Sequence, residues 1–116
     1  MSFTAETIKQ AYESGATDIN GREYEFDKIN FRNARKIFAF FSSIVGGLEA
    51  NDISFIDSPE FDAIEKIIRQ HTLFDGHLLQ KLGDAHFEEF SEDYISFVIV
   101  AMGVFSYPFT KGSASA

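Results

Sequence analysis

Three histidines in the second half of the chain are the residues whose type best suits metal binding. They are His71, His77 and His86, with Asp75, Asp84 and Glu88 as candidate carboxylate ligands. Their spacing fits no established ligand pattern, such as the two histidines one helical turn apart in His-Glu-x-x-His. We therefore expect structural or surface roles for the histidines, and we predict no metal and no cofactor.

Adjacent acidic residues offer a second candidate chemistry, a general acid–base pair. The pairs are Glu88-Glu89 and Glu92-Asp93, but neighbouring side chains on a helix point apart and usually form a solvated face. The chain has no Gly-x-Ser-x-Gly, no Walker loop and no glycine-rich dinucleotide turn. A small enzyme would instead need a pocket that gathers perturbed carboxylates and histidines. We predict that the protein is not an enzyme.

Length and composition limit the remaining classes. The 116 residues suffice for one core, and 45% hydrophobic with 24% charged residues is ordinary for a globular protein. Cysteine is absent, which excludes disulfide scaffolds. The longest apolar run, Phe97–Phe105, is about half the ~20 residues of a membrane span, and the first residues do not resemble a signal peptide. We expect no membrane insertion.

Local signals predict a mainly α-helical (α+β) domain over residues 1–111, followed by a flexible tail over 112–116. Thr4 is a favourable N-cap for a helix ending at Ser14, before Gly15. Asn20-Gly21 lies between alternating segments and predicts a small β-hairpin, because a type I′ turn needs positive φ at both central residues.

A second helix should run from Phe31 to about Val45, with Asn30 as N-cap and Gly46-Gly47 as its stop. At 100° per residue its large apolar side chains share one broad sector. These are Phe31, Ala34, Ile37, Phe38, Phe41, Ile44 and Val45. Phe40 lies outside this stripe, at the border with the basic face, so we expect it at the surface.

The second half of the chain should contain further helices. Ser58-Pro59-Glu60 is a strong helix start, and its buried stripe should comprise Phe61, Ile64, Ile67 and Ile68. Short helices are expected from Asp75 to Leu82 and from Asp84 to Phe90. The last helix should run from Ser91 to Tyr107, because Pro108 cannot continue it. Since this helix is apolar on every side, it must be either the central helix or an interface element.

Charge is unevenly distributed along the chain. The formal net charge is −8, yet residues 28–36 hold four basic groups and no acid, whereas residues 49–93 are strongly acidic. The basic residues are Lys28, Arg32, Arg35 and Lys36. Such a split suits head-to-tail self-association or an electropositive partner. Four bases on an acidic domain argue against nucleic-acid binding.

Several segments resemble a known family. They are Ser58-Pro59-Glu60-Phe61, Leu73-Phe74-Asp75-Gly76, Asp93-Tyr94 and Ser106-Tyr107-Pro108-Phe109. Their succession over about residues 19–112 is similar to the small tail assembly chaperones of long, non-contractile-tailed bacteriophages and prophages. The resemblance implies a helical protein of the host cytoplasm that is absent from the mature virion. It implies binding to the tape measure protein, which the chaperone keeps soluble while tail tube protein, a further partner, polymerises around it.

The aromatic content favours such a binding protein. Fourteen phenylalanines exceed what so short a chain readily buries, so we expect exposed apolar surface and a homo-oligomer. Our predicted partner-binding residues are Phe38, Phe40, Phe41, Ile44 and Val45. The alternative function is an acidic inhibitor that mimics nucleic acid and binds a basic host protein through the stretch from Glu49 to Asp93.

Overall fold

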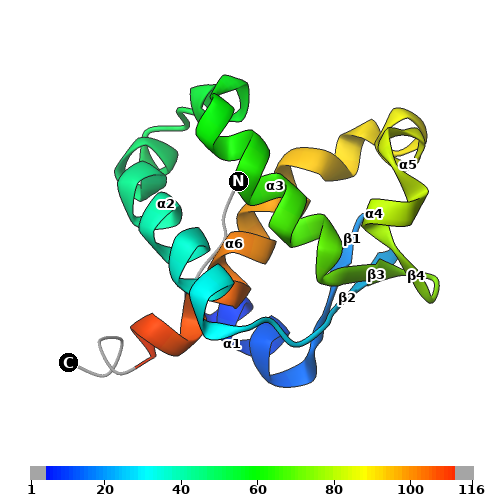
Figure 1. Cartoon of the computed structure of the whole chain (residues 1–116), viewed down its shortest axis with the longest axis horizontal. Helices are drawn as coiled ribbons and strands as arrows, with labels where there is room; N and C mark the ends of the chain where they lie inside the picture. Colours follow the sequence, from blue (N-terminus) through cyan, green and yellow to red (C-terminus); the bar gives the residue numbers. More distant parts are fainter. Residues whose placement is uncertain (1–4, 112–116) are drawn as a thin grey trace.

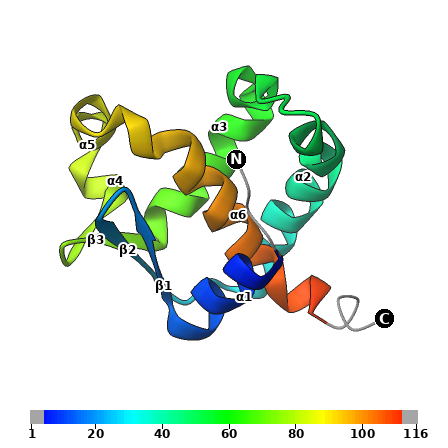
Figure 2. The ribbon, with the colours of Figure 1, turned by 180° about the vertical axis from the view of Figure 1, so that it is seen from behind.

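An apolar helix, α6 (Tyr94–Thr110), runs through the centre of the protein (Figures 1 and 2). The computed structural model describes residues 5–111. Helices α1 (Ala5–Ser14), α2 (Phe31–Glu49) and α3 (Pro59–Gln70) pack against α6. Every residue from Phe97 to Ser106 is buried, which confirms the prediction of a central helix. The stretch Ser91–Thr110 is long and apolar enough to cross a membrane, but most of it is buried inside the protein.

A four-stranded antiparallel sheet lies beside α6, with Tyr24 packed on Phe97 and Phe26 on Phe105. Its order is β1 (Ala16–Ile19), β2 (Arg22–Phe26), β3 (Thr72–Phe74) and β4 (His77–Leu78). The predicted hairpin is confirmed: Asn20 and Gly21 have φ of 55° and 84°. Together with the helices, the sheet makes the fold mainly α with a small β component, as predicted.

A second hairpin replaces part of a predicted helix. Asp75 and Gly76 have φ of 52° and 80° and join β3 to β4. The helix expected from Asp75 to Leu82 is therefore wrong, and only α4 (Leu79–Leu82) is helical there. The physical reason is that Asp-Gly favours the same turn as Asn-Gly, and the edge of β2 offers a partner, with Tyr24 opposite Phe74.

The first helix ends as expected and lies unusually close to α6. Gly15 has a φ of 76° after Ser14, as the predicted stop requires. A Cβ at Gly103 of α6 would lie 2.6 Å from Ile8 Cδ1, so the glycine allows α1 to approach. The predicted N-cap Thr4 and the predicted tail 112–116 lie outside the described residues.

Helix α2 is longer than predicted. Asn30 caps it, its side chain accepting the Asn33 N–H at 2.8 Å, but Gly46-Gly47 does not end it. The helix continues to Glu49 because Leu48 packs against the core. The left-handed residue after its end is Asn51, with a φ of 62°.

The 3-10 turn η1 (Ser54–Asp57) leads into α3, whose predicted start is confirmed. Ser58 caps the helix by accepting the Phe61 N–H at 3.1 Å. Phe61, Ile64 and Ile68 are buried, whereas Ile67 is half-buried. Glu65 and Arg69, one helical turn apart, form an ion pair at 3.2 Å.

The last helix differs from the prediction at both ends. The turns α5 (Asp84–Glu89) and η2 (Ser91–Asp93) precede it, so α6 begins at Tyr94 rather than Ser91. Pro108 does not end it, and the helix continues to Thr110. Packing of the last turn offsets the lost hydrogen bond, because Phe109 stacks on Phe38 of α2 with ring centroids 5.0 Å apart.

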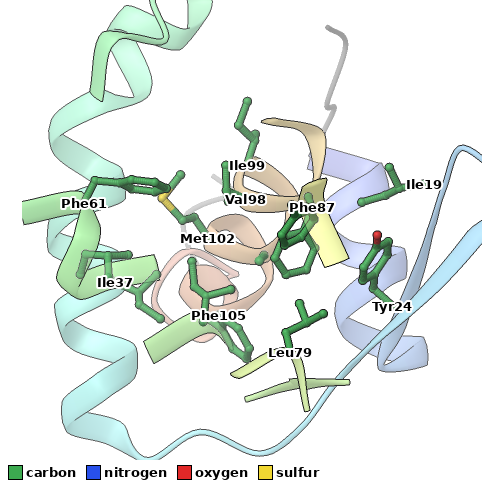
Figure 3. Packing of buried hydrophobic residues seen from close by; sticks show 14 of the residues in the cluster. Ile19, Tyr24, Ile37, Phe61, Leu79, Phe87, Val98, Ile99, Met102 and Phe105 are labelled. Carbon is green, nitrogen blue, oxygen red and sulfur yellow. The ribbon is translucent and has the colours of Figure 1, made fainter. Parts of the chain in front are cut away.

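Aromatic and aliphatic side chains from α2 to α5 and from the strands β1 and β2 meet on α6 (Figure 3). The large core includes Tyr24, Phe61, Phe87, Phe97 and Phe105. Ala11, Val100 and Val104 form a smaller cluster between α1 and α6. The aromatic excess is mostly absorbed: within residues 5–111, the exposed large apolar side chains are Tyr12, Phe31, Val45 and Ile53.

Candidate functional site

Four side chains form a hydrogen-bonded cluster, the polar clasp, consisting of Arg22, Tyr24, His86 and Asp93. Asp93 is completely buried at the start of α6. Its carboxylate accepts from Arg22 Nε at 2.6 Å and from Tyr24 Oη at 2.7 Å. Asn20 Nδ2 donates to the same carboxylate at 2.8 Å. The clasp thus ties the β1–β2 hairpin to the N-terminus of the central helix.

His86 completes the clasp from α5. Its Nε2 lies 2.8 Å from Tyr24 Oη. Since the single hydroxyl proton of Tyr24 is donated to Asp93, Nε2 of His86 must carry the proton in the other hydrogen bond. Arg22 also pairs with Glu92 at 2.6 Å, and its guanidinium lies 4.2 Å from the Phe90 ring centroid.

Burial and hydrogen bonding shift the pKa values of the clasp in opposite directions. Burial raises the pKa of the Asp93 carboxyl, but its hydrogen-bond donors, Arg22 first among them, outweigh burial and hold this pKa at about 2. Burial, reinforced by the hydrogen bond to Asp93, raises the pKa of Tyr24. Burial also lowers the pKa of His86. At neutral pH the clasp therefore contains an ionised carboxylate, a neutral phenol and a neutral imidazole.

The clasp is better suited to hold the fold than to react. A carboxylate with so low a pKa is a weak base, and its oxygens already accept several hydrogen bonds. Tyr24 and Asp93 are fully buried, and His86 is 7% exposed. The arrangement can therefore fix the hairpin on α6, and its carboxylate and phenol are closed off from solvent.

The other histidines and acids of residues 5–111 do not form a metal site. His71 Nδ1 lies 2.8 Å from the carbonyl oxygen of Ile67, and His77 is exposed on β4. Glu88 and Glu89 are exposed on α5. Within residues 5–111, no three histidine, cysteine or acidic side chains come close enough to hold a metal ion.

The five predicted partner-binding residues all lie on α2 but in different environments. Phe38 stacks on Phe109, whereas Phe41 and Ile44 are half-buried against the core. Val45 is 40% exposed. Contact between these five side chains and a partner stays a prediction.

Phe40 is not the exposed ring that we expected. It packs against Phe61 and Phe55 with ring centroids 5.9 and 6.2 Å apart. Helix α2 contacts α3 as well as α6, so its buried face is turned toward Phe40. The same orientation of the helix leaves Phe31 and Val45 exposed, although both belong to its predicted apolar sector.

An apolar hollow on the surface, the aromatic groove, lies between α1, the segment 26–29 and the end of α6. It has a volume of about 330 Å³. Its apolar lining is Tyr12, Phe26, Ile29, Val104, Phe105 and Pro108. Beside it, Phe31 is 68% exposed and leans on Phe109 with ring centroids 5.7 Å apart. Tyr12 is 38% exposed and packs on Tyr107.

A basic stripe begins at this groove, continues along the start of α2, and consists of Lys28, Arg32, Arg35 and Lys36. Lys28 lines the groove itself, and the other three are exposed on the first two turns of α2. Among the described residues, lysine and arginine form ion pairs only through Arg22 and Arg69. The stripe therefore forms no ion pair among the described residues, and Asp27 is the one acid that lines the groove beside it.

Comparison with known proteins adds no family assignment: no protein-family model, no curated protein and no solved structure matches this chain. Sequence reasoning missed both the clasp and the groove. Arg22 and Tyr24 are two residues apart on a strand and therefore share a face, but nothing local indicated that Asp93 would meet them. Phe31 is the first residue of α2, where a ring can remain outside the packed face of the helix. Its position was the one feature of the sequence that pointed to an exposed aromatic side chain near the groove.

Proposed function

We propose that this protein is a tail assembly chaperone of the long, non-contractile-tailed phage type. It binds an apolar helical segment of the tape measure protein and keeps that protein soluble, without catalysing a reaction. The observation that carries the proposal is the aromatic groove, which is lined by exposed Tyr12 and lies near exposed Phe31, on an otherwise acidic body.

The physical requirements of such a chaperone agree with these features. A long helical client with apolar stripes aggregates through those stripes, and an apolar groove on a soluble domain can cover them. A net charge of −8 keeps the chaperone from aggregating through its own groove. The self-contained hydrogen bonding of the clasp supports a binding role rather than a chemical one.

The test is co-expression with the tape measure protein of the same phage genome. The soluble fraction of that protein is measured with this chain, without it, and with the Phe31→Ala variant. We expect solubility and co-purification only when a binding-competent chain is present. Unchanged solubility together with a failure to co-purify would show that the proposal is wrong.

The acidic-inhibitor alternative is supported by the exposure of its proposed surface. Ten of the twelve acids between Glu49 and Asp93 are exposed, the others being Glu65 and Asp93. They are Glu49, Asp52, Asp57, Glu60, Asp62, Asp75, Asp84, Glu88, Glu89 and Glu92. Binding to a basic host protein should weaken strongly as salt rises, because exposed charges are screened. Binding through an apolar groove should change much less over the same range.

A further inference from the structure

We infer that the aromatic groove and the basic stripe form one docking surface for an acidic amphipathic helix. The inference rests on the proposed function, because it names the kind of client segment that the chaperone would hold. Such a helix would insert a large apolar side chain beside Phe31 and place carboxylates on the other side of that ring, against Arg32 and Arg35.

The shape of the surface supplies the apolar half of the argument. Three exposed residues from separate parts of the chain, Tyr12, Phe31 and Pro108, meet at or beside one hollow. Figure 1 shows why they meet: α1, the start of α2 and the end of α6 converge at one end of the protein. Each ring is also supported from behind, Tyr12 by Tyr107 and Phe31 by Phe109, so the surface is preformed.

The basic stripe supplies the charged half. Arg35 lies about one turn after Phe31 on the same face of α2, and Arg32 lies next to it. Neither arginine has an ion-pair partner among residues 5–111. Cations near a helix N-terminus oppose the helix dipole, so their position weakens α2 slightly. A ligand with carboxylates beside its apolar anchor would complement both features.

A second copy of this chain fits the surface less well than a separate helix. Of the large apolar side chains that are exposed within residues 5–111, only Ile53 lies in the acidic stretch 49–93. The acids of that stretch are spread over α3, α5 and the turns between helices. A second copy would therefore offer carboxylates with little apolar surface to fill the groove.

The test uses two synthetic amphipathic peptides of about 18 residues, a helix of about 27 Å. Both carry the same leucine and phenylalanine stripe, and the polar face holds glutamate in one and lysine in the other. Binding to the full chain is measured by fluorescence anisotropy. We expect the glutamate peptide to bind about tenfold or more tightly than the lysine peptide. Equal binding of both peptides, or binding of neither, would overturn the inference.

Variants then locate the surface. Phe31→Ala should weaken binding of the glutamate peptide about tenfold or more. The double variant Arg32→Glu/Arg35→Glu should remove the preference for glutamate over lysine. Its matched control is Lys66→Glu/Lys81→Glu, which changes the net charge equally at exposed positions away from the groove. If both double variants lost the preference for the glutamate peptide equally, net charge alone would explain the preference, and the inference would be overturned.

Two further measurements distinguish a helical partner from a second copy of the chain, and the docking inference from the proposed chaperone function. If sedimentation velocity shows a dimer of the wild type that Phe31→Ala dissociates, a second copy occupies the groove and the inference is wrong. If Arg32→Glu/Arg35→Glu still keeps the tape measure protein soluble as well as the wild type does, the inference is wrong while the chaperone function stands. If the wild-type chain fails with the tape measure protein but shows the expected peptide selectivity, the proposed function alone is wrong.

Discussion

The polar clasp and the aromatic groove lie at opposite ends of α6 and differ in how fully their side chains are satisfied. Arg22 of the clasp bonds to Asp93 and Glu92 and lies over Phe90. Arg32 and Arg35, next to the groove, are exposed and have no ion pair with any described residue. The clasp satisfies its own charges, whereas the groove end leaves both charge and apolar surface for something else.

This difference separates residues that stabilise the fold from residues that are exposed and available for binding. Asp93 and Tyr24 are fully buried, so their hydrogen bonds stabilise the native state. Phe31 is 68% exposed and contributes little to the core. Substitutions in the clasp should therefore change stability, and substitutions at the groove should change binding.

The largest effect is expected from Asp93→Ala. Removing this fully buried carboxylate takes the hydrogen-bond acceptor from Tyr24, Asn20 and Arg22, which should cost about 3 kcal/mol of unfolding free energy. Urea denaturation followed by circular dichroism measures this loss. Glu92→Ala is the matched control, because this second carboxylate on Arg22 is 58% exposed and should cost less than about 1 kcal/mol. Similar losses in both variants would contradict the central role of Asp93.

The next effect distinguishes two phenylalanines on the same helix. Phe40→Ala should cost about 2–3 kcal/mol, because the half-buried ring packs on Phe55 and Phe61. Phe31→Ala should change the unfolding free energy by less than about 0.5 kcal/mol. The same denaturation experiment checks both variants, and binding of the glutamate peptide should show the reverse order. A larger stability loss in Phe31→Ala would show that the groove belongs to the core.

The fold could be predicted from the sequence where local signals decide the structure, and not where packing between distant segments decides it. Short-range signals worked where they were strong: Asn20-Gly21 turned the chain and Ser58 capped a helix. They failed where packing overrode them. Helix α2 continues beyond Gly46-Gly47 because Leu48 packs against the core, and α6 continues beyond Pro108 because Phe109 stacks on Phe38. Asp75-Gly76 carried the same turn signal as Asn20-Gly21, so the second hairpin was predictable in principle.

The candidate sites depended on contacts between distant parts of the chain. Arg22 and Asp93 are 71 residues apart in sequence, and neither residue type indicates a buried pair by itself. Phe40 was misplaced because the periodicity of α2 gives an apolar sector but not its exact orientation against two neighbouring helices. The groove could not be predicted for the same reason, since α1, α2 and α6 each contribute only part of it.

Acid should weaken the clasp by a smaller amount than removing Asp93. The pKa of Asp93 is about 2 in the folded protein against 3.8 for the unperturbed group, so its stabilisation is present above pH 3.8 and is lost as the pH falls toward 2. The difference corresponds to about 2 kcal/mol. Urea midpoints between pH 5 and pH 2 should therefore fall more steeply for the wild type than for Asp93→Asn. Parallel profiles would show that other groups cause the acid sensitivity.

The smallest effect should have the opposite sign and comes from the basic stripe. Arg32 is the second residue of α2, and the first turn of this helix has no acidic residue. Arg32→Glu should raise the unfolding free energy by about 0.3–1 kcal/mol, because a carboxylate is favourable near a helix N-terminus and a cation is not. Thermal unfolding at low ionic strength measures the change.

Lys66→Glu is the matched control for Arg32→Glu, since it changes the net charge equally in the middle of α3. It places a carboxylate one turn after Asp62 and should lower stability by a few tenths of a kcal/mol, roughly the size of a like-charge pair on a helix. If Arg32→Glu stabilises the fold and also weakens binding of the glutamate peptide, Arg32 is kept for binding at a cost in stability. If Arg32→Glu destabilises the fold as Lys66→Glu does, Arg32 stabilises α2 as the clasp residues stabilise α6, and the contrast between the two ends of α6 does not hold.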